Sequence, residues 1–169
     1  MRKIMGLLLL SAACFGAQAQ EVKAVVIATD VPFSTPDAID GAVKNECGLP
    51  NKVSTLMREQ FAAAGIEASA VTDLKPDSGE TVLQLEIAEA SAGGNAFTGK
   101  KASLTVTGKL LKKGQQVAQF TGMRLTRGGA YGNLKGNCAL LGRCVEAVAK
   151  DAAGWLKSPV DGAKLGDAK

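Results

Sequence analysis

The sequence contains no histidine and few aromatic residues. Its 169 residues include one tryptophan, one tyrosine and five phenylalanines. Without histidine the chain lacks the commonest general base, every Ser-His or Cys-His nucleophilic pair and the imidazole ligands of zinc. The scarcity of rings leaves no aromatic platform for sugars or for stacked nucleic acid bases. We therefore expect a protein that is not an enzyme.

The charge balance gives no strong electrostatic signal either. The chain has 20 basic and 16 acidic residues and a formal net charge of +4, which falls to +2 if Arg2 and Lys3 are removed. No basic run is present, so neither nucleic acid nor an anionic membrane is indicated as a partner. Beyond the N-terminus no apolar run approaches the roughly 20 residues that span a bilayer. We expect no transmembrane segment in the mature chain, and the oligomeric state is not indicated.

The N-terminus has the features of a secretory signal peptide. Met1-Arg2-Lys3 precedes an apolar run from Ile4 to Gly16, and Ala17-Gln18-Ala19 forms a small-residue cleavage site. Cleavage after Ala19 would leave one domain over residues 20–158 and a flexible tail over residues 159–169, in the periplasm or secreted. The alternative is lipid attachment at Cys14 and an outer-membrane anchor. The signal for lipid attachment typically has leucine three places before the cysteine, and this chain has Ser11 at that position.

The stretch Thr81–Arg127 predicts three consecutive antiparallel strands. Leu104 and Val106 alternate with Thr105 and Thr107, the period of two expected when one face of a strand is buried. The apolar positions change phase late in the third strand, which predicts a β-bulge at or near Gly122.

Two more strands and two helices are expected around this meander. Residues 22–29 form a near-continuous apolar run typical of a central strand, and residues 68–74 predict a second strand. The spacing of apolar residues predicts one helix capped by Asn51 and another capped by Asn137. The second helix should end before Pro159.

Three cysteines remain if the signal peptide is removed, namely Cys47, Cys138 and Cys144. Cys138 and Cys144 would lie about 9 Å apart along one helix, too far for a disulfide. Cys47 therefore pairs with one of them, and we favour Cys138 at the helix start, with Cys144 free. The alternative is three unpaired buried thiols.

The favoured disulfide selects a topology. It requires the third strand to run parallel to the first, so that the loop over residues 30–50 and the connector over residues 128–137 emerge at the same edge. The predicted fold is α+β, with a five-stranded mixed sheet and two helices packed on one face.

This order of elements resembles the small domains of bacterial envelope proteins, such as the amino-terminal domain of TolB and related accessory lipoproteins, and the resemblance implies the strand order 2-1-3-4-5. The resemblance is carried by Val22 to Thr29, the helix from Asn51 to Ala64, the alternating block Thr81 to Arg127, and Trp155-Leu156 in the closing helix. It implies a periplasmic role in binding a partner, and it implies no catalytic residues.

The two tied loops are the predicted binding surface for a protein partner. Their candidate contact residues are Asp37, Asp40, Glu46, Arg127, Tyr131 and Lys135. Residues 128–136 are glycine-rich, but Lys135 precedes Gly136-Asn137 where a phosphate-binding loop needs Gly-Lys-Ser/Thr.

The carboxylates of the first loop leave one catalytic alternative open. Asp30, Asp37, Asp40 and Glu46 do not match a calcium-binding loop, so we expect no metal and no cofactor. Two of them could serve a small secreted hydrolase as acid and base. The other alternative function is a lipid-anchored assembly component attached through Cys14.

Overall fold

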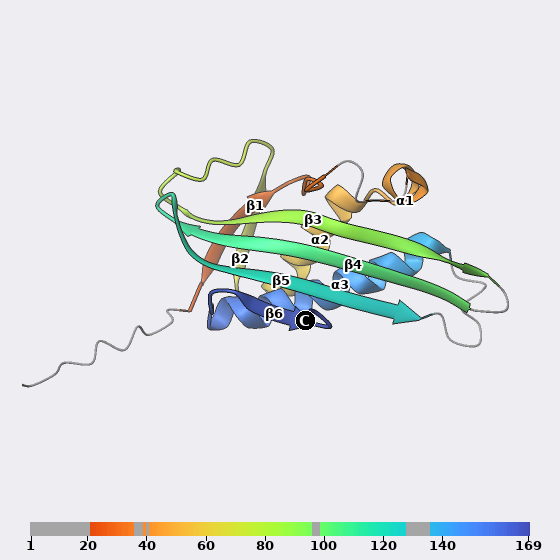
Figure 1. Cartoon of the computed structure of the whole chain (residues 1–169). Coiled ribbons are helices and arrows are strands. Elements are labelled where there is room, and N and C mark those ends of the chain that lie inside the picture. The colour runs from red at the N-terminus through yellow and green to blue at the C-terminus, as the bar shows by residue number, and fades with distance from the viewer. Residues whose placement is uncertain (1–20, 36–38, 40, 96–98, 128–135) are drawn as a thin grey trace, which may run out of the picture.

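A computed structural model describes residues 21–35, 39, 41–95, 99–127 and 136–169. The strands are β1 (Ala24–Ala28), β2 (Glu67–Val71), β3 (Thr81–Asn95), β4 (Gly99–Lys112), β5 (Gln115–Arg127) and β6 (Ala163–Gly166). The helices are α1 (Gly41–Glu46), α2 (Leu49–Ala63) and α3 (Asn137–Lys157). The strands form one mixed sheet of order β2-β1-β3-β4-β5-β6 (Figure 1). The predicted α+β class and the strand order 2-1-3-4-5 are confirmed, and β6 extends the sheet beyond β5.

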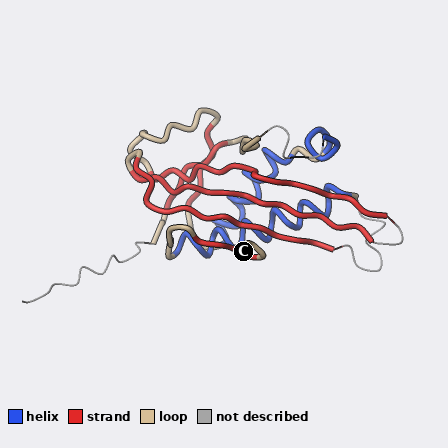
Figure 2. The backbone as a smooth tube through the Cα atoms, in the orientation of Figure 1, coloured by secondary structure: helices blue, strands red, loops and turns tan. Residues whose placement is uncertain are grey.

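The long antiparallel strands β3, β4 and β5 form the predicted meander. Leu104 and Val106 are buried toward α3, whereas Thr105 and Thr107 alternate with them on the opposite, open face. Figure 2 shows the strands as one layer and α2 and α3 as a second layer behind it. The sheet therefore has one covered face and one open face.

The bulge expected near Gly122 is wrong. Gly122 pairs regularly with Val106, and the shift in register between β4 and β5 falls near Val117 instead. A Cβ atom at Gly122 would lie 3.1 Å from Cγ1 of Val148 in α3. The missing side chain thus makes room for the helix, which is why the apolar pattern is interrupted there without a break in pairing.

Each flank of the sheet is a strand-helix-strand unit with parallel strands. β1 pairs with β2, and β5 pairs with β6, in parallel. Residues 159–169, expected to be a flexible tail, contain β6 and are paired to the sheet. Because α2 and α3 cover the same face while the two units extend the sheet in opposite directions, their crossovers have opposite handedness (Figure 1). The β5-α3-β6 unit is the left-handed one, against the strong general preference for right-handed crossovers.

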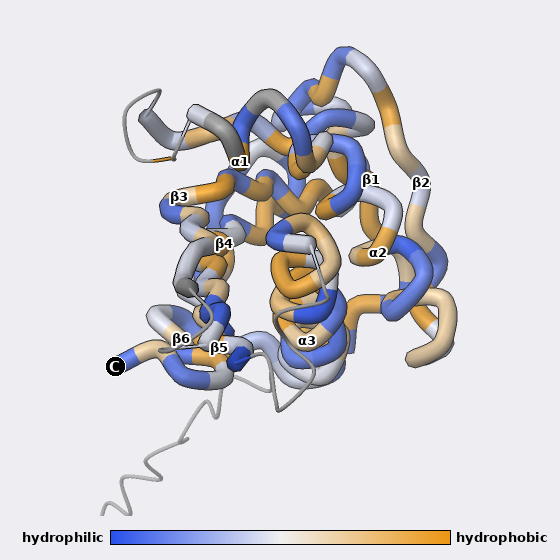
Figure 3. Tube along the Cα trace, turned by 90° about the vertical axis from the view of Figure 1, so that its right-hand side faces the viewer, coloured by the Kyte–Doolittle hydropathy of each residue, from blue (hydrophilic) through white to orange (hydrophobic). Residues whose placement is uncertain are grey.

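The core lies between the meander and the helices. In Figure 3 the apolar positions of α3 lie next to the strands. Phe120 of β5 packs edge-to-face on Trp155 of α3, with ring centroids 4.9 Å apart. Burying each large apolar side chain of this kind contributes roughly 1.5 to 3 kcal/mol.

The long segment after β1 is partly ordered against β3. Phe33 and Ile39 form isolated parallel bridges to Ile87 and Ala90. Because β1 itself pairs with β3 only at Val26, these bridges cover more of the same edge of β3. The segment expected as an irregular loop therefore continues the sheet before α1 begins.

Candidate functional site

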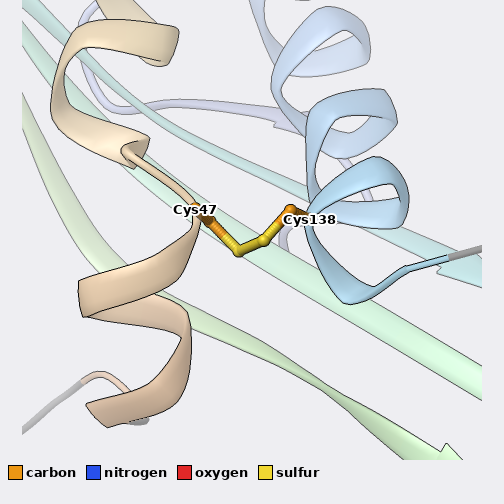
Figure 4. Close-up of a disulfide and its surroundings, with 2 residues drawn as sticks. All are labelled: Cys47 and Cys138. Carbon is orange, nitrogen blue, oxygen red and sulfur yellow. A yellow bond between two sulfur atoms is a disulfide. The ribbon is translucent and has the colours of Figure 1, made fainter.

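The disulfide joins the two segments that the sequence placed at one edge. Cys47 and Cys138 are bonded, with Cα atoms 5.1 Å apart and a sequence separation of 91 residues (Figure 4). This is the pairing favoured from the sequence. Cys47 lies between α1 and α2, and Cys138 is the second residue of α3, so the bond holds the beginnings of α2 and α3 together.

Neither helix begins as the sequence predicted. Gly48 is the N-cap of α2 and adopts a left-handed conformation with φ of 55°, which only glycine adopts readily. Gly136 is the N-cap of α3, and neither helix has a side-chain capping bond. Asn51 and Asn137 therefore lie inside the helices, and the predicted asparagine caps are wrong.

The two helices run parallel. β1 and β5 point in the same direction, and each is followed by a helix that returns in the opposite direction. Their N-terminal ends, which carry the positive ends of the helix dipoles, therefore meet at the disulfide. The first turn of each helix contains no acidic residue. The two helix N-termini therefore contribute positive potential at this end, and the exposed Glu46 beside the disulfide adds one negative charge.

A groove of about 570 Å³ runs between α2 and α3 from the disulfide onward. One stripe of each helix lines the groove. The lining residues are Gly48, Asn51, Lys52, Thr55 and Leu56 from α2 and its cap, and Cys138, Ala139, Gly142, Arg143 and Glu146 from α3. Among the described residues, neither Lys52 nor Arg143 forms an ion pair. The groove thus combines apolar residues with two cations and one carboxylate, Glu146, so its side chains carry a net positive charge.

The remaining cysteine is buried under the meander rather than in the groove. Cys144 is inaccessible, and its thiol donates a weak hydrogen bond to the carbonyl oxygen of Ala102 at 3.7 Å. Burial raises the pKa of the Cys144 thiol, and a hydrogen bond to Thr126 opposes that shift only in part. A protonated, enclosed thiol is a poor nucleophile, so Cys144 packs as a small apolar residue.

The structure describes only two of the predicted contact residues, Glu46 and Arg127, and it does not place them on one surface. Glu46 is exposed at the end of α1, next to the disulfide. Arg127 ends β5 on the open face of the sheet, because it pairs with Lys101 and lies three residues after Arg124, which contacts α3. The sheet therefore separates Arg127 from the groove. Asp37, Asp40, Tyr131, Lys135 and Cys14 lie outside the described residues.

Sequence reasoning missed Lys52 and Arg143. Lys52 lies four residues before Leu56, and Arg143 lies four residues after Ala139, so each cation shares a helix face with another lining residue. That pattern identifies one stripe of each helix, but it does not indicate that the two stripes face each other. The parallel packing of α2 and α3 supplies this information.

The described residues offer no preformed metal centre. No three cysteine, aspartate or glutamate side chains in this part of the chain converge as ligands. Asp30 is exposed just after β1, and the other acidic loop residues either are exposed or fall outside the description. None of the helices in the described ranges is long and apolar enough to cross a bilayer.

The fold defines a class, an α+β domain whose single mixed sheet is covered on one face by two parallel helices. No family model matches the sequence, and no curated protein matches it. Among solved structures, it is similar to a Xanthomonas campestris protein of the DUF330 family, with 12% identity, coverage of 83% of this chain and 87% of that one, and a TM-score of 0.57. At this identity the likeness shows a shared fold.

Two further solved structures match less well. A PelC dodecamer from Paraburkholderia phytofirmans is 13% identical, with 86% and 94% of the two chains covered and a TM-score of 0.49. A minor lipoprotein from Acinetobacter baumannii is 11% identical, with 80% and 92% covered and a TM-score of 0.47. The resemblance to the TolB amino-terminal domain stays a prediction.

Proposed function

We propose that this protein is a non-enzymatic, exported protein of the bacterial envelope that binds a protein partner at the groove between α2 and α3. The single observation that carries the proposal is the groove itself. Its two walls are held at a fixed spacing by the Cys47–Cys138 disulfide, and it presents cations that have no partner within the described residues. A pre-organised groove loses little freedom on binding, which favours affinity.

The chemistry of the groove points to an acidic, amphipathic segment as the occupant. Leu56, Ala139 and the disulfide offer apolar contact, while Lys52 and Arg143 outnumber the single carboxylate of Glu146 and offer charge complementarity to an acidic partner. The parallel dipoles of α2 and α3 add positive potential at the same end. A short helix of the partner with carboxylates beside an apolar stripe would match this groove.

Export supports the choice of an envelope partner. The N-terminal pattern is that of a signal peptide, and a disulfide persists in oxidising compartments. The mass of the exported protein distinguishes cleavage after Ala19 from lipid attachment at Cys14. Cleavage after Ala19 gives a chain beginning at Gln20, whereas lipid attachment gives a modified Cys14 at the new N-terminus.

The test of the proposed function is site-specific crosslinking in the native envelope. A photo-crosslinking side chain at Thr55, a half-buried residue of the groove, should capture a defined protein. Capture should decrease at least tenfold when Lys52→Glu and Arg143→Glu are introduced together. Lys150→Glu, an exposed charge reversal on α3 outside the groove, serves as the control. Capture that is equally strong in all of these variants would exclude the groove as the binding site.

A further inference from the structure

The open face of the sheet carries two cations directly opposite each other. Lys101 of β4 pairs with Arg127 of β5, and both side chains are exposed. Directly opposed residues have Cβ atoms roughly 5 Å apart, and like charges in that position destabilise a sheet. The third member of the same row is Gly93 of β3, which has no side chain to intervene.

No carboxylate compensates this pair within the described residues. Neither Lys101 nor Arg127 takes part in an ion pair there. The nearby Asp167 lies at the edge of β5, where its carboxylate accepts a hydrogen bond from the backbone N–H of Leu125 at 3.0 Å and approaches Arg124. Its charge is therefore directed to the edge of the sheet and to the side that faces α3.

The two cations line a hollow of about 570 Å³ on this face. The next row of the sheet supplies Ser91, Ser103 and Leu125. The two serine hydroxyls are 2.7 Å apart, so only one of them donates to the other and the second proton is available to a ligand. Leu125 is 59% exposed and forms an apolar wall.

We propose that this hollow binds a phosphate group, which the Lys101 and Arg127 side chains neutralise and a serine hydroxyl of the Ser91–Ser103 pair orients. A doubly charged oxyanion removes the repulsion between the cations and accepts charge-assisted hydrogen bonds from both. Exposed Leu125 beside the cations suits a phosphate that is attached to an apolar group. The carrier is either an anionic lipid headgroup or a soluble phosphate ester, and the test separates the two.

The test uses the purified protein with two probes. The first is sedimentation with vesicles of phosphatidylglycerol and phosphatidylcholine, compared with vesicles of phosphatidylcholine alone. The second is titration with glycerol phosphate, followed through the backbone amide signals of residues 91, 101, 103 and 127. Binding to the anionic vesicles alone identifies a lipid headgroup, and saturable shifts with glycerol phosphate identify a soluble ester. Binding of neither probe would overturn the proposal.

Variants test whether these side chains form the site. Lys101→Gln and Arg127→Gln should each weaken binding about tenfold or more, as expected for the loss of one charge-assisted contact. Lys109→Gln removes the same charge from the open face of β4 outside the hollow and should change binding less than twofold. Equal losses in all three variants would show a diffuse charge effect and contradict the proposal.

Stability supplies an independent measurement. If the two cations face each other without a bound anion, Lys101→Gln should raise the midpoint of thermal unfolding at low ionic strength, and added salt should reduce the gain. A lower midpoint would mean that the side chain has a structural role, which would overturn the assignment.

Discussion

The two flanks of the sheet use the same strand-helix-strand plan and are stabilised differently. The β1-α2-β2 flank makes a right-handed crossover, and five consecutive residue pairs join its strands. The β5-α3-β6 flank makes the disfavoured left-handed crossover with four pairs. At this second flank, side chains add contacts: Arg124 binds Asp151 through two hydrogen bonds of 2.7 and 2.8 Å, and the Trp155 indole donates to the carbonyl oxygen of Val160.

The side chains of the second flank thus tie α3 to β5 and to the segment that leads into β6, and Asp167, directly after β6, accepts a hydrogen bond from the backbone N–H of Leu125. In the first flank the corresponding bond joins the hydroxyl of Ser54 in α2 to the carbonyl oxygen of Ala28 in β1. The Arg124 guanidinium has its pKa raised chiefly by its hydrogen bond to Asp151, which indicates a favourable pair in the folded state. A raised pKa stabilises the folded state at every pH below the ordinary pKa of arginine, which lies far above neutral pH. The contribution of Arg124 is therefore fully present across the usual pH range.

The largest effect should come from removing the bond that links the α2 side to the α3 side. Replacing both Cys47 and Cys138 with alanine removes the cross-link between two residues that are 91 positions apart in the sequence. In the chain-entropy description this lowers the free energy of unfolding by about 4 to 5 kcal/mol. Urea unfolding measures the loss, and the reduced wild-type protein is the matched control. A loss below about 1 kcal/mol would mean that the unfolded chain is already constrained.

The second comparison places alanine at a left-handed glycine in each flank. Gly166 has φ of 67°, and a Cβ atom there would clash with Met123 and Arg124. Gly65, after α2, has φ of 81° and open space around it. We expect Gly65→Ala to cost about 1 kcal/mol from the backbone alone and Gly166→Ala about 3 kcal/mol, because overpacking adds to it. Equal losses in thermal unfolding would contradict a tightly packed β6.

The third change removes one charge from the ion pair of the second flank. Asp151→Asn should lower the free energy of unfolding by about 1 to 2 kcal/mol, because the pair is bidentate and only partly exposed. Hydrogen exchange at the Asp167 amide, which donates to Met123, should accelerate more than exchange in β2. Asp73→Asn, at the exposed pair with Lys75, should have almost no effect. Uniform acceleration over the whole sheet would argue against a separate role for the pair.

The smallest effect concerns the thiol beneath the meander. Because burial raises the pKa of Cys144, the unfolded chain loses this proton at a lower pH than the folded protein does. The free energy of unfolding should therefore decrease as the pH rises above about 8.5, by at most about 1.4 kcal/mol per pH unit from this group. The decrease is measured as the difference between wild type and Cys144→Ala. Parallel pH profiles would show that the thiol titrates equally in both states.

Local patterns explain which parts of the fold could be predicted. Alternation in the meander and helical spacing along α2 and α3 are set by neighbouring residues, so they identify which face of each element is buried. The reach of a disulfide excluded a Cys138–Cys144 bond, and the favoured Cys47–Cys138 pairing in turn required the third strand to run parallel to the first. The full strand order was implied by the resemblance to envelope domains.

The remaining features depend on contacts between residues distant in the sequence. The four residues of β6 are too short and too polar to show a pattern, and the handedness of their crossover opposes the usual preference. Lys52 and Arg143 meet across a groove only because α2 and α3 pack in parallel, and Arg127 lies on the opposite face because the register of β5 decides its direction. By itself the sequence determined the first five strands and the two long helices, and it favoured their covalent tie. The tertiary structure decided which charged side chains share a surface, because that depends on packing between elements rather than on periodicity within one.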